Sequence, residues 1–293
     1  MINPTLSEYC QRTFGEKLYK LSLDGGFSCP NRDGTVGDRG CTFCLNGSGD
    51  FSVPVGDDVD RAIEEAKAVV AGKHSCRKYI AYFQSFTGTY APRPRLRALY
   101  GAVIAHPDVA VLDIATRPDC LDDEVLALLR ELNAVKPVWV ELGLQTVHPA
   151  TAEAIRRGYE LPVFDDAVRR LKEAGITVIV HMILGLPGET PEMMAQTAAH
   201  IGRSGADGIK FQLLHVLEGT DLAEDYRAGK FRTLELDEYI AILKRCLSEI
   251  PEDMVIHRLT GDGPKRSLIA PLWSADKKRV LNEVRKALQG TQH

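Results

Sequence analysis

The chain has 293 residues, of which 44% are hydrophobic and 26% charged, so it is neither a disordered nor a fibrous protein. Its formal net charge of -4, from 36 basic and 40 acidic residues, excludes a globally basic nucleic-acid-binding protein but allows a local basic patch. The sequence contains no apolar run near the ~20 residues that span a bilayer and no signal for export at its start. We therefore expect a cytoplasmic protein with no membrane partner.

Short apolar runs alternate with segments of helical spacing along most of the chain. The runs, which predict strands, cover residues 19–23, 79–83, 109–114, 138–142, 178–184 and 209–214. Most of them are rich in valine and isoleucine, which is typical of parallel strands that are buried on both faces. The segments between them predict helices over residues 57–71, 94–105, 121–132, 164–174 and 191–204.

Six strand–helix units between residues 19 and 250 predict an α/β fold with a parallel sheet. The first strand is not followed by a glycine-rich dinucleotide fingerprint, and polar residues follow almost every strand, as at the rim of a barrel. These two observations favour a partial (β/α)6 TIM-type barrel over an open, doubly wound sheet. We expect the barrel to comprise residues 1–250, with a C-terminal extension of residues 251–293 packed on it.

Three of the seven cysteines share the polar loop that follows the first predicted strand. Cys29, Cys41 and Cys44 are spaced as Cys-x11-Cys-x2-Cys, and the closer pair can reach one metal centre. A structural zinc site needs a fourth ligand, for which His74 and Cys76 are the candidates. Three thiolates also suit a [4Fe–4S] cluster whose fourth iron is left for another ligand. The residues alone leave zinc, an iron–sulfur cluster and three free thiols open.

The loop sequence GGFSCPNRDGTVGDRGCTFC resembles the cluster loop of radical S-adenosylmethionine (SAM) enzymes. Its long first gap departs from the commoner Cys-x3-Cys-x2-Cys and is similar to the small bacterial YtqA/YhcC-like group, which is related to the Elongator catalytic subunit. The motifs YFQSFTGTYAP, ATRPDCL, VELGLQT, VHMILGLPGET, LLHVLEGTDL and LTGDGPKRSLIAPLW follow in the order expected for that group. The resemblance implies that Cys29, Cys41 and Cys44 hold a [4Fe–4S] cluster and that SAM binds its fourth iron.

The same resemblance implies a set of SAM contacts at the ends of the strands. They are Gln84 and Ser85 after the second strand, Thr116 after the third, Gln145 after the fourth, His181 in the fifth, and Arg157, which would pair with the SAM carboxylate. Ordinary structural roles remain open for three of them. Arg157 can end a solvated helix, Gln145 can belong to a helix-entry turn, and His181 can be a buried histidine that its neighbours satisfy.

The related Elongator-like enzymes act on the wobble uridine of tRNA. The resemblance therefore implies tRNA as a partner, an electron donor such as flavodoxin or ferredoxin, and conversion of a carboxymethylaminomethyl side chain to aminomethyl. His257, Arg258 and Asp262 are the candidate substrate contacts, and the chain from residue 263 carries seven basic and two acidic residues. The alternatives are a radical SAM oxidoreductase for a small molecule or peptide, and a non-catalytic, zinc-bound RNA-binding protein.

Overall fold

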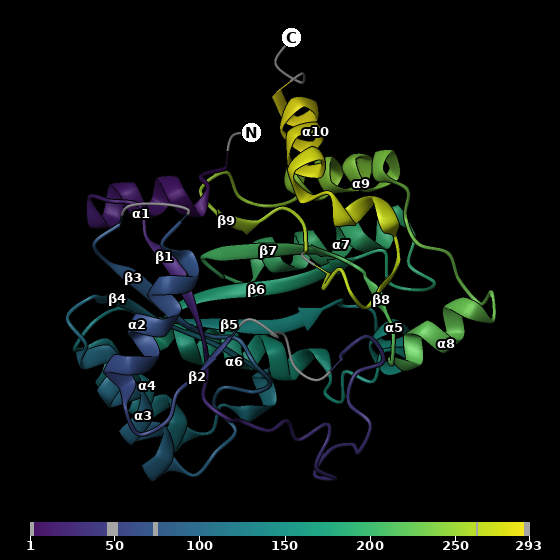
Figure 1. Cartoon of the computed structure of the whole chain (residues 1–293). Coiled ribbons are helices and arrows are strands. Elements are labelled where there is room, and N and C mark those ends of the chain that lie inside the picture. Colours follow the sequence, from purple (N-terminus) through teal and green to yellow (C-terminus); the bar gives the residue numbers. More distant parts are fainter. Residues whose placement is uncertain (1–2, 46–51, 73–75, 262, 290–293) are drawn as a thin grey trace.

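A parallel eight-stranded sheet forms the centre of the protein (Figure 1). The computed structural model describes residues 3–45, 52–72, 76–261 and 263–289. The strands are β1 (Tyr19–Asp24), β2 (Val53–Pro54), β3 (Tyr79–Phe83), β4 (Val109–Thr116), β5 (Val138–Gln145), β6 (Thr177–Leu184), β7 (Gly208–Leu213) and β9 (Val255–Arg258). They lie in the order β2-β1-β3-β4-β5-β6-β7-β9, and a separate antiparallel pair joins β8 (Val216–Leu217) to β10 (Leu268–Ala270).

Helices connect the strands and cover the outer face of the sheet (Figure 1). They are α1 (Leu6–Phe14), α2 (Val59–Val70), α3 (Arg93–Ala105), α4 (Asp123–Asn133), α5 (Pro149–Ala154), α6 (Leu161–Glu173), α7 (Pro191–Arg203), α8 (Asp221–Arg227), α9 (Leu236–Ser248) and α10 (Lys277–Gln289), with short 3-10 turns η1 (Pro118–Cys120) and η2 (Leu272–Ala275). None of the described helices has both the length and the apolarity required to cross a membrane.

Local sequence signals explain where two of these helices begin and end. Thr190 accepts a hydrogen bond from the backbone N–H of Met193, so its hydroxyl caps α7, and Pro191 occupies the first turn. Gly175 and Gly205 follow α6 and α7 with φ of 72° and 86°, a left-handed conformation that glycine adopts without strain. Each βα unit is therefore bounded by its own residues, which sets the length of each connection.

The predicted α/β class and parallel sheet are confirmed. All six expected strands are present, each expected helical segment contains a helix, and β2 and β9 add a strand at each edge of the sheet. Beyond residue 250 the chain contributes β9, which pairs with β7, and then α10. The division into residues 1–250 and 251–293 stays a prediction.

Helix α1 closes the end of the barrel at which the strands begin (Figure 1). An apolar cluster there joins Cys10 and Leu18 to inward-facing strand residues Ile80, Val111 and Trp139. The N-terminal segment is also tied to the sheet edge, because the backbone N–H of Ile256 in β9 donates to the carbonyl of Pro4. Alternate residues of a strand share a face, so the side chains two positions further along face the space above this floor.

Candidate active site

The three loop cysteines lie beyond the carboxyl end of β1, and all three are half-buried and free of disulfides. A backbone hydrogen bond of 3.0 Å from Cys44 to Cys41 closes the turn between the last two. Burial, together with the neighbouring thiols of Cys44 and Cys29, raises the pKa of Cys41 to about 11. The loop therefore brings the three predicted ligands near enough to one another for their charges to interact.

Two side chains that the sequence did not single out shape this loop. Asn31 is buried, and its amide nitrogen donates to the carbonyl of Arg156 at 2.6 Å and to the Cys41 sulfur at 3.5 Å. Arg32 donates to the carbonyls of Cys44 and Leu45 at 2.6 and 2.8 Å. The sequence did offer a signal for these two residues. A loop without regular structure needs donors for its backbone carbonyls, and Asn31 and Arg32 lie inside the cysteine loop.

The loop also rests on the segment that follows β5. Gly158 has φ of 81°, and a side chain there would meet Val36 of the loop at 2.7 Å. The backbone N–H of Thr42 donates to the carbonyl of Ile155, and the N–H of Leu222 in α8 donates to the carbonyl of Thr42. Contacts from two distant segments thus hold the middle of the loop in one conformation.

Among the described residues, no three His, Cys, Asp or Glu side chains converge so as to hold a single metal ion. A [4Fe–4S] cluster divides its thiolate ligands among separate iron atoms, so its ligands need not meet at one point. Three neighbouring free thiols in an ordered loop fit that group. His74, one of the two candidates for a fourth zinc ligand, lies outside the described residues.

Arg157, the predicted partner of the SAM carboxylate, is 4% exposed and hydrogen-bonds backbone carbonyls. Its guanidinium donates to Thr146 at 2.6 Å, to Leu144 at 3.3 Å and to Tyr159 at 2.8 and 3.1 Å. All of its nitrogens are used, so a bidentate bond to a carboxylate requires some of these bonds to break. Its role with SAM stays a prediction, and here it braces the turn after β5.

Arg117 is the arginine whose charge acts on the loop cysteines. It forms a bidentate ion pair with Asp119 at 2.7 and 2.9 Å and donates to the carbonyl of Arg157 at 2.9 Å. Its positive charge opposes the rise in the pKa of Cys41, for which burial is the main cause. From the sequence, Arg117 belongs to the motif ATRPDCL after the third predicted strand, and no role was predicted for it.

Gln145 ends β5 in a conformation that side chains seldom adopt. Its φ is 68°, and the pairing of β5 with β6 shifts by one residue between Gly143 and Gln145. Its side-chain oxygen is buried and accepts no hydrogen bond from any described residue. An orphaned acceptor on a strained residue at the barrel mouth is what a ligand-binding position shows, which agrees with its predicted SAM contact.

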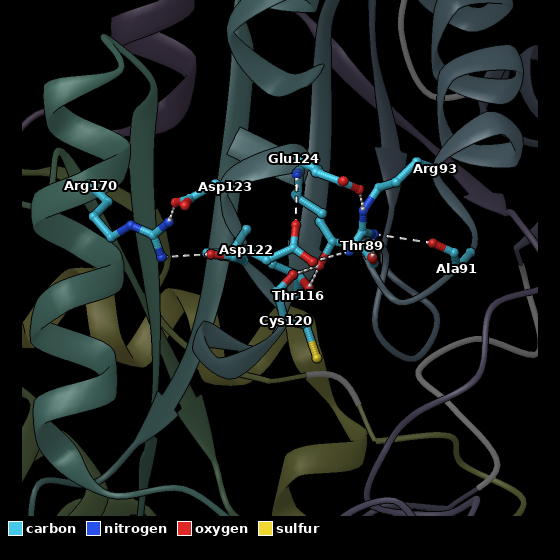
Figure 2. A network of polar contacts seen from close by, with 11 residues as sticks. Thr89, Ala91, Arg93, Thr116, Cys120, Asp122, Asp123, Glu124 and Arg170 are labelled. Carbon is cyan, nitrogen blue, oxygen red and sulfur yellow. Dashed lines mark hydrogen bonds and ion pairs between the residues drawn. The ribbon is translucent and has the colours of Figure 1, made fainter. Parts of the chain in front are cut away.

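Thr116 is buried in a polar network beside the loop, which Figure 2 shows. The Thr89 hydroxyl donates to the carbonyl of Cys120 at 2.6 Å, so the Thr116 hydroxyl must donate to Thr89, also at 2.6 Å. Arg93 crosses the same region and pairs with Asp122, the cap of α4. The hydroxyl proton of Thr116 is therefore committed to Thr89, and the predicted contact of Thr116 with SAM stays a prediction.

A hollow of about 490 Å³ opens between this network and the cysteine loop. Its lining comprises Pro30, Thr35, Val36, Thr89, Tyr90, Ala91, Pro92, Arg93, Asp119, Cys120 and Asp122.

The two remaining predicted SAM contacts, Gln84 and Ser85, follow β3. Ser85 is buried, whereas Gln84 is half-buried and donates to the hydroxyl of Ser52 at 3.2 Å.

His181 belongs to a layer of charged side chains inside the barrel. We call Lys20, Asp113, Glu141, His181, Lys210 and Arg258 the interior charge layer. Glu141 is at its centre: it is fully buried and accepts from Lys20 at 2.6 Å, from His181 at 2.7 Å and from Lys210. His181 in turn has the Gln212 amide 3.2 Å from its Nδ1. Both ring nitrogens of the histidine are therefore engaged by neighbours, and a bond to SAM would have to replace one of these two bonds.

Burial and charge shift the pKa values of this layer in opposite directions. Burial raises the pKa of Asp113 to about 7, and the charge of Glu141 adds to the rise. Burial also lowers the pKa of Lys210 to about 7, against the opposing pull of Glu141. Although burial acts against it, the two lysines hold the pKa of Glu141 well below its usual value. Glu141 is thus the anion on which the other charges depend.

Two of the three candidate substrate residues lie at the edge of the sheet. His257 and Arg258 are in β9, and Asp262 lies outside the described residues. The His257 ring packs edge-on against Trp139 of the barrel floor, with ring centroids 5.5 Å apart, and burial lowers its pKa well below the usual value. Arg258 is the register partner of Lys210.

The arrangement of thiols at the carboxyl ends of parallel strands has a direct parallel among known families. Residues 34–201 match the family described as the Radical SAM superfamily, and residues 206–290 match its C-terminal domain. The chain belongs to the radical SAM superfamily. This radical SAM enzyme uses a [4Fe–4S] cluster and SAM, which favours the iron–sulfur interpretation of the cysteine loop over zinc and over three free thiols.

Two bacterial relatives match this radical SAM enzyme over nearly its whole length, which confirms the predicted YtqA/YhcC-like group. YtqA of Bacillus subtilis is 45% identical over 286 residues, or 97% of this chain and 89% of that protein. YhcC of Escherichia coli is 37% identical over 283 residues, or 93% and 90%. A tRNA uridine(34) acetyltransferase of Methanocaldococcus jannaschii is 29% identical over 161 residues, which cover 54% of this chain and 29% of that one.

Among solved structures, the archaeal Methanocaldococcus infernus Elp3 shares the fold with a TM-score of 0.71. It is 17% identical in sequence, and the match covers 93% of this chain and 63% of that one. This radical SAM enzyme therefore spans less than two thirds of Elp3, and the likeness shows the fold alone.

Proposed function

We propose that this radical SAM enzyme acts on tRNA, and that it converts a carboxymethylaminomethyl side chain on the wobble uridine to aminomethyl. The observation that carries the proposal is the trio of free thiols at the mouth of a parallel barrel, in a chain whose relatives include tRNA uridine(34) acetyltransferases. The cluster, when bound, supplies the electron that cleaves SAM reductively.

The residues of the chain provide the remaining requirements. Cys29, Cys41 and Cys44 hold the iron, while Asn31 and Arg32 fix the loop around them. Gln145 offers its unpaired oxygen to SAM. The apolar floor beneath α1 keeps water from the end of the barrel at which the strands begin.

A basic surface at the C-terminal end supports an RNA substrate. A hollow of about 560 Å³ at the start of α10 is lined by four basic residues and one acidic residue, with Leu272 exposed beside them: Lys265, Lys277, Lys278, Arg279 and Asp276. In a chain of net charge -4, this local excess suits contact with phosphates. We also propose flavodoxin or ferredoxin as the electron donor, and the cytoplasm as the compartment where tRNA and donor meet.

The test uses anaerobically reconstituted protein, SAM, reduced flavodoxin and tRNA that carries carboxymethylaminomethyl uridine. Nucleoside mass spectrometry should show aminomethyl uridine, and chromatography should show deoxyadenosine. Cys44→Ala should abolish both products and lower the iron content, because one of three ligands is missing. Cys76→Ser, a half-buried cysteine outside the loop, is the matched control and should behave as wild type. Cleaved SAM with unchanged uridine would overturn the proposal.

A further inference from the structure

Arg258 is the member of the interior charge layer that has no partner among the described residues. Lys20 and Lys210 both donate to Glu141, and Lys20 also donates to Asp113. The guanidinium of Arg258 forms no hydrogen bond or ion pair with any side chain that the structure describes, although the residue is half-buried. A partly desolvated guanidinium without an anion is costly unless a ligand completes it.

The position of Arg258 places it beside the interior charge layer. Its Cα is the register partner of Lys210, at a point where the pairing of β9 with β7 shifts by one residue, so that His257 and Arg258 together lie opposite one position of β7. Its charge acts on the same interior groups: burial is the main cause of the pKa shifts of His181, Lys210 and Tyr82, and Arg258 contributes to each. Arg258 therefore lies close to the other charged groups of the layer.

The layer holds more basic than acidic side chains. With both acids ionised and Lys210 protonated, three cations, Lys20, Lys210 and Arg258, face two anions, Asp113 and Glu141. Lys210 also keeps a free N–H, because Tyr82, at 3.1 Å, and Glu141 accept only two of its three protons. One further anion would balance the charge, and it would receive a guanidinium fork and an ammonium proton.

We propose that Arg258, with Lys210, binds the carboxylate of the substrate side chain and so makes the enzyme select wobble uridines that carry a carboxymethyl group. This assignment rests on the proposed function, which supplies the tRNA substrate. A guanidinium matches the two oxygens of a carboxylate, and β9 is an edge strand of the sheet, beside the open side of the barrel. An incoming carboxylate also holds the proton on Lys210, whose pKa burial has lowered to about 7.

The first test measures binding without turnover. N-methylglycine reproduces the carboxymethylamine end of the side chain, and methylamine lacks its carboxylate. We expect saturable binding of N-methylglycine to the wild-type protein by calorimetry, no binding of methylamine, and an affinity about 10- to 100-fold lower in Arg258→Gln. Arg258→Lys, which keeps the charge but loses the fork, should be intermediate. Equal binding by wild type and R258Q, or none by wild type, would overturn the assignment.

The second test separates this assignment from the proposed function. With modified tRNA, R258Q should raise KM by about 10- to 100-fold while iron content and SAM binding stay unchanged. Arg245→Gln, a surface arginine paired with Glu192, is the matched control. If wild type converts the tRNA and R258Q does so equally well, the carboxylate site fails and the function stands. A parallel loss of SAM binding in R258Q would assign the guanidinium to SAM instead. If wild type leaves the tRNA unchanged but binds N-methylglycine through Arg258, the function fails and the site stands.

Discussion

Replacing Glu141 with glutamine should destabilise the protein more than any exchange of a surface carboxylate. Glu141 is fully buried and accepts from two lysines and a histidine, so the variant leaves Asp113 as the one anion beside Lys20 and Lys210. Breaking a buried pair in this way costs about 3–5 kcal/mol. That is a large part of the roughly 5–15 kcal/mol by which a folded protein is stable.

Urea unfolding followed by circular dichroism measures this loss. With a slope of about 3 kcal/mol per molar urea, the midpoint of Glu141→Gln should fall by about 1–1.7 M. The control is Glu131→Gln, which breaks an exposed pair with Arg97 and should leave the midpoint unchanged. A midpoint for E141Q within error of wild type would refute the view that Glu141 organises the layer.

The pH dependence of this difference has a definite sign. The folded protein holds the pKa of Glu141 well below the usual value of 4.5, so its ionised form stabilises the fold above about pH 4.5. That contribution is lost as the pH falls through the lower, folded pKa. The difference between wild type and E141Q should therefore shrink below pH 4.5.

Three further predictions concern other positions. Burial lowers the pKa of His257 well below 6.5, so its neutral form stabilises the fold above that pH, and His257→Asn should flatten the loss of stability measured by urea unfolding between about pH 6.5 and 5; an unchanged slope would contradict this. Gln145→Gly should relieve about 1 kcal/mol of backbone strain and raise the melting temperature while weakening SAM binding by calorimetry; a lower melting temperature would show that the residue is not strained. Thr190→Ala should cost about 1 kcal/mol in urea unfolding because α7 loses its cap, with Thr190→Ser as the conservative control; equal stability of the two variants would argue against the cap.

The sequence predicted the strands well because apolar runs of valine and isoleucine are a local signal. It missed β2, which has two residues, and gave no sheet position to β9, because the pairing of β9 with β7 depends on tertiary register. The interior charge layer left a trace that was not used: Lys20, Asp113, Glu141, His181 and Lys210 each interrupt an apolar strand. Their common face follows from the period of two, but their pairing requires the register of five strands.

The candidate site shows the same division between local and long-range information. The cysteine spacing identified the loop, because its three candidate ligands lie within one short stretch of the chain. The family resemblance selected Arg157, whose guanidinium the structure shows donating to carbonyls of Leu144, Thr146 and Tyr159. Asn31 and Arg32 escaped notice because their acceptors are backbone groups that come near only when the chain is folded.

Helix α1 and the apolar side chains beneath the interior charge layer fill the end of the barrel at which the strands begin. Under the proposed function, SAM, the nucleoside and the products would then share the end of the barrel at which the strands finish. A tRNA bound there would block that end of the barrel. SAM should therefore bind before the RNA, and the cleaved nucleoside should leave only after the RNA has dissociated. This fixed order of binding and release would appear as ordered steady-state kinetics.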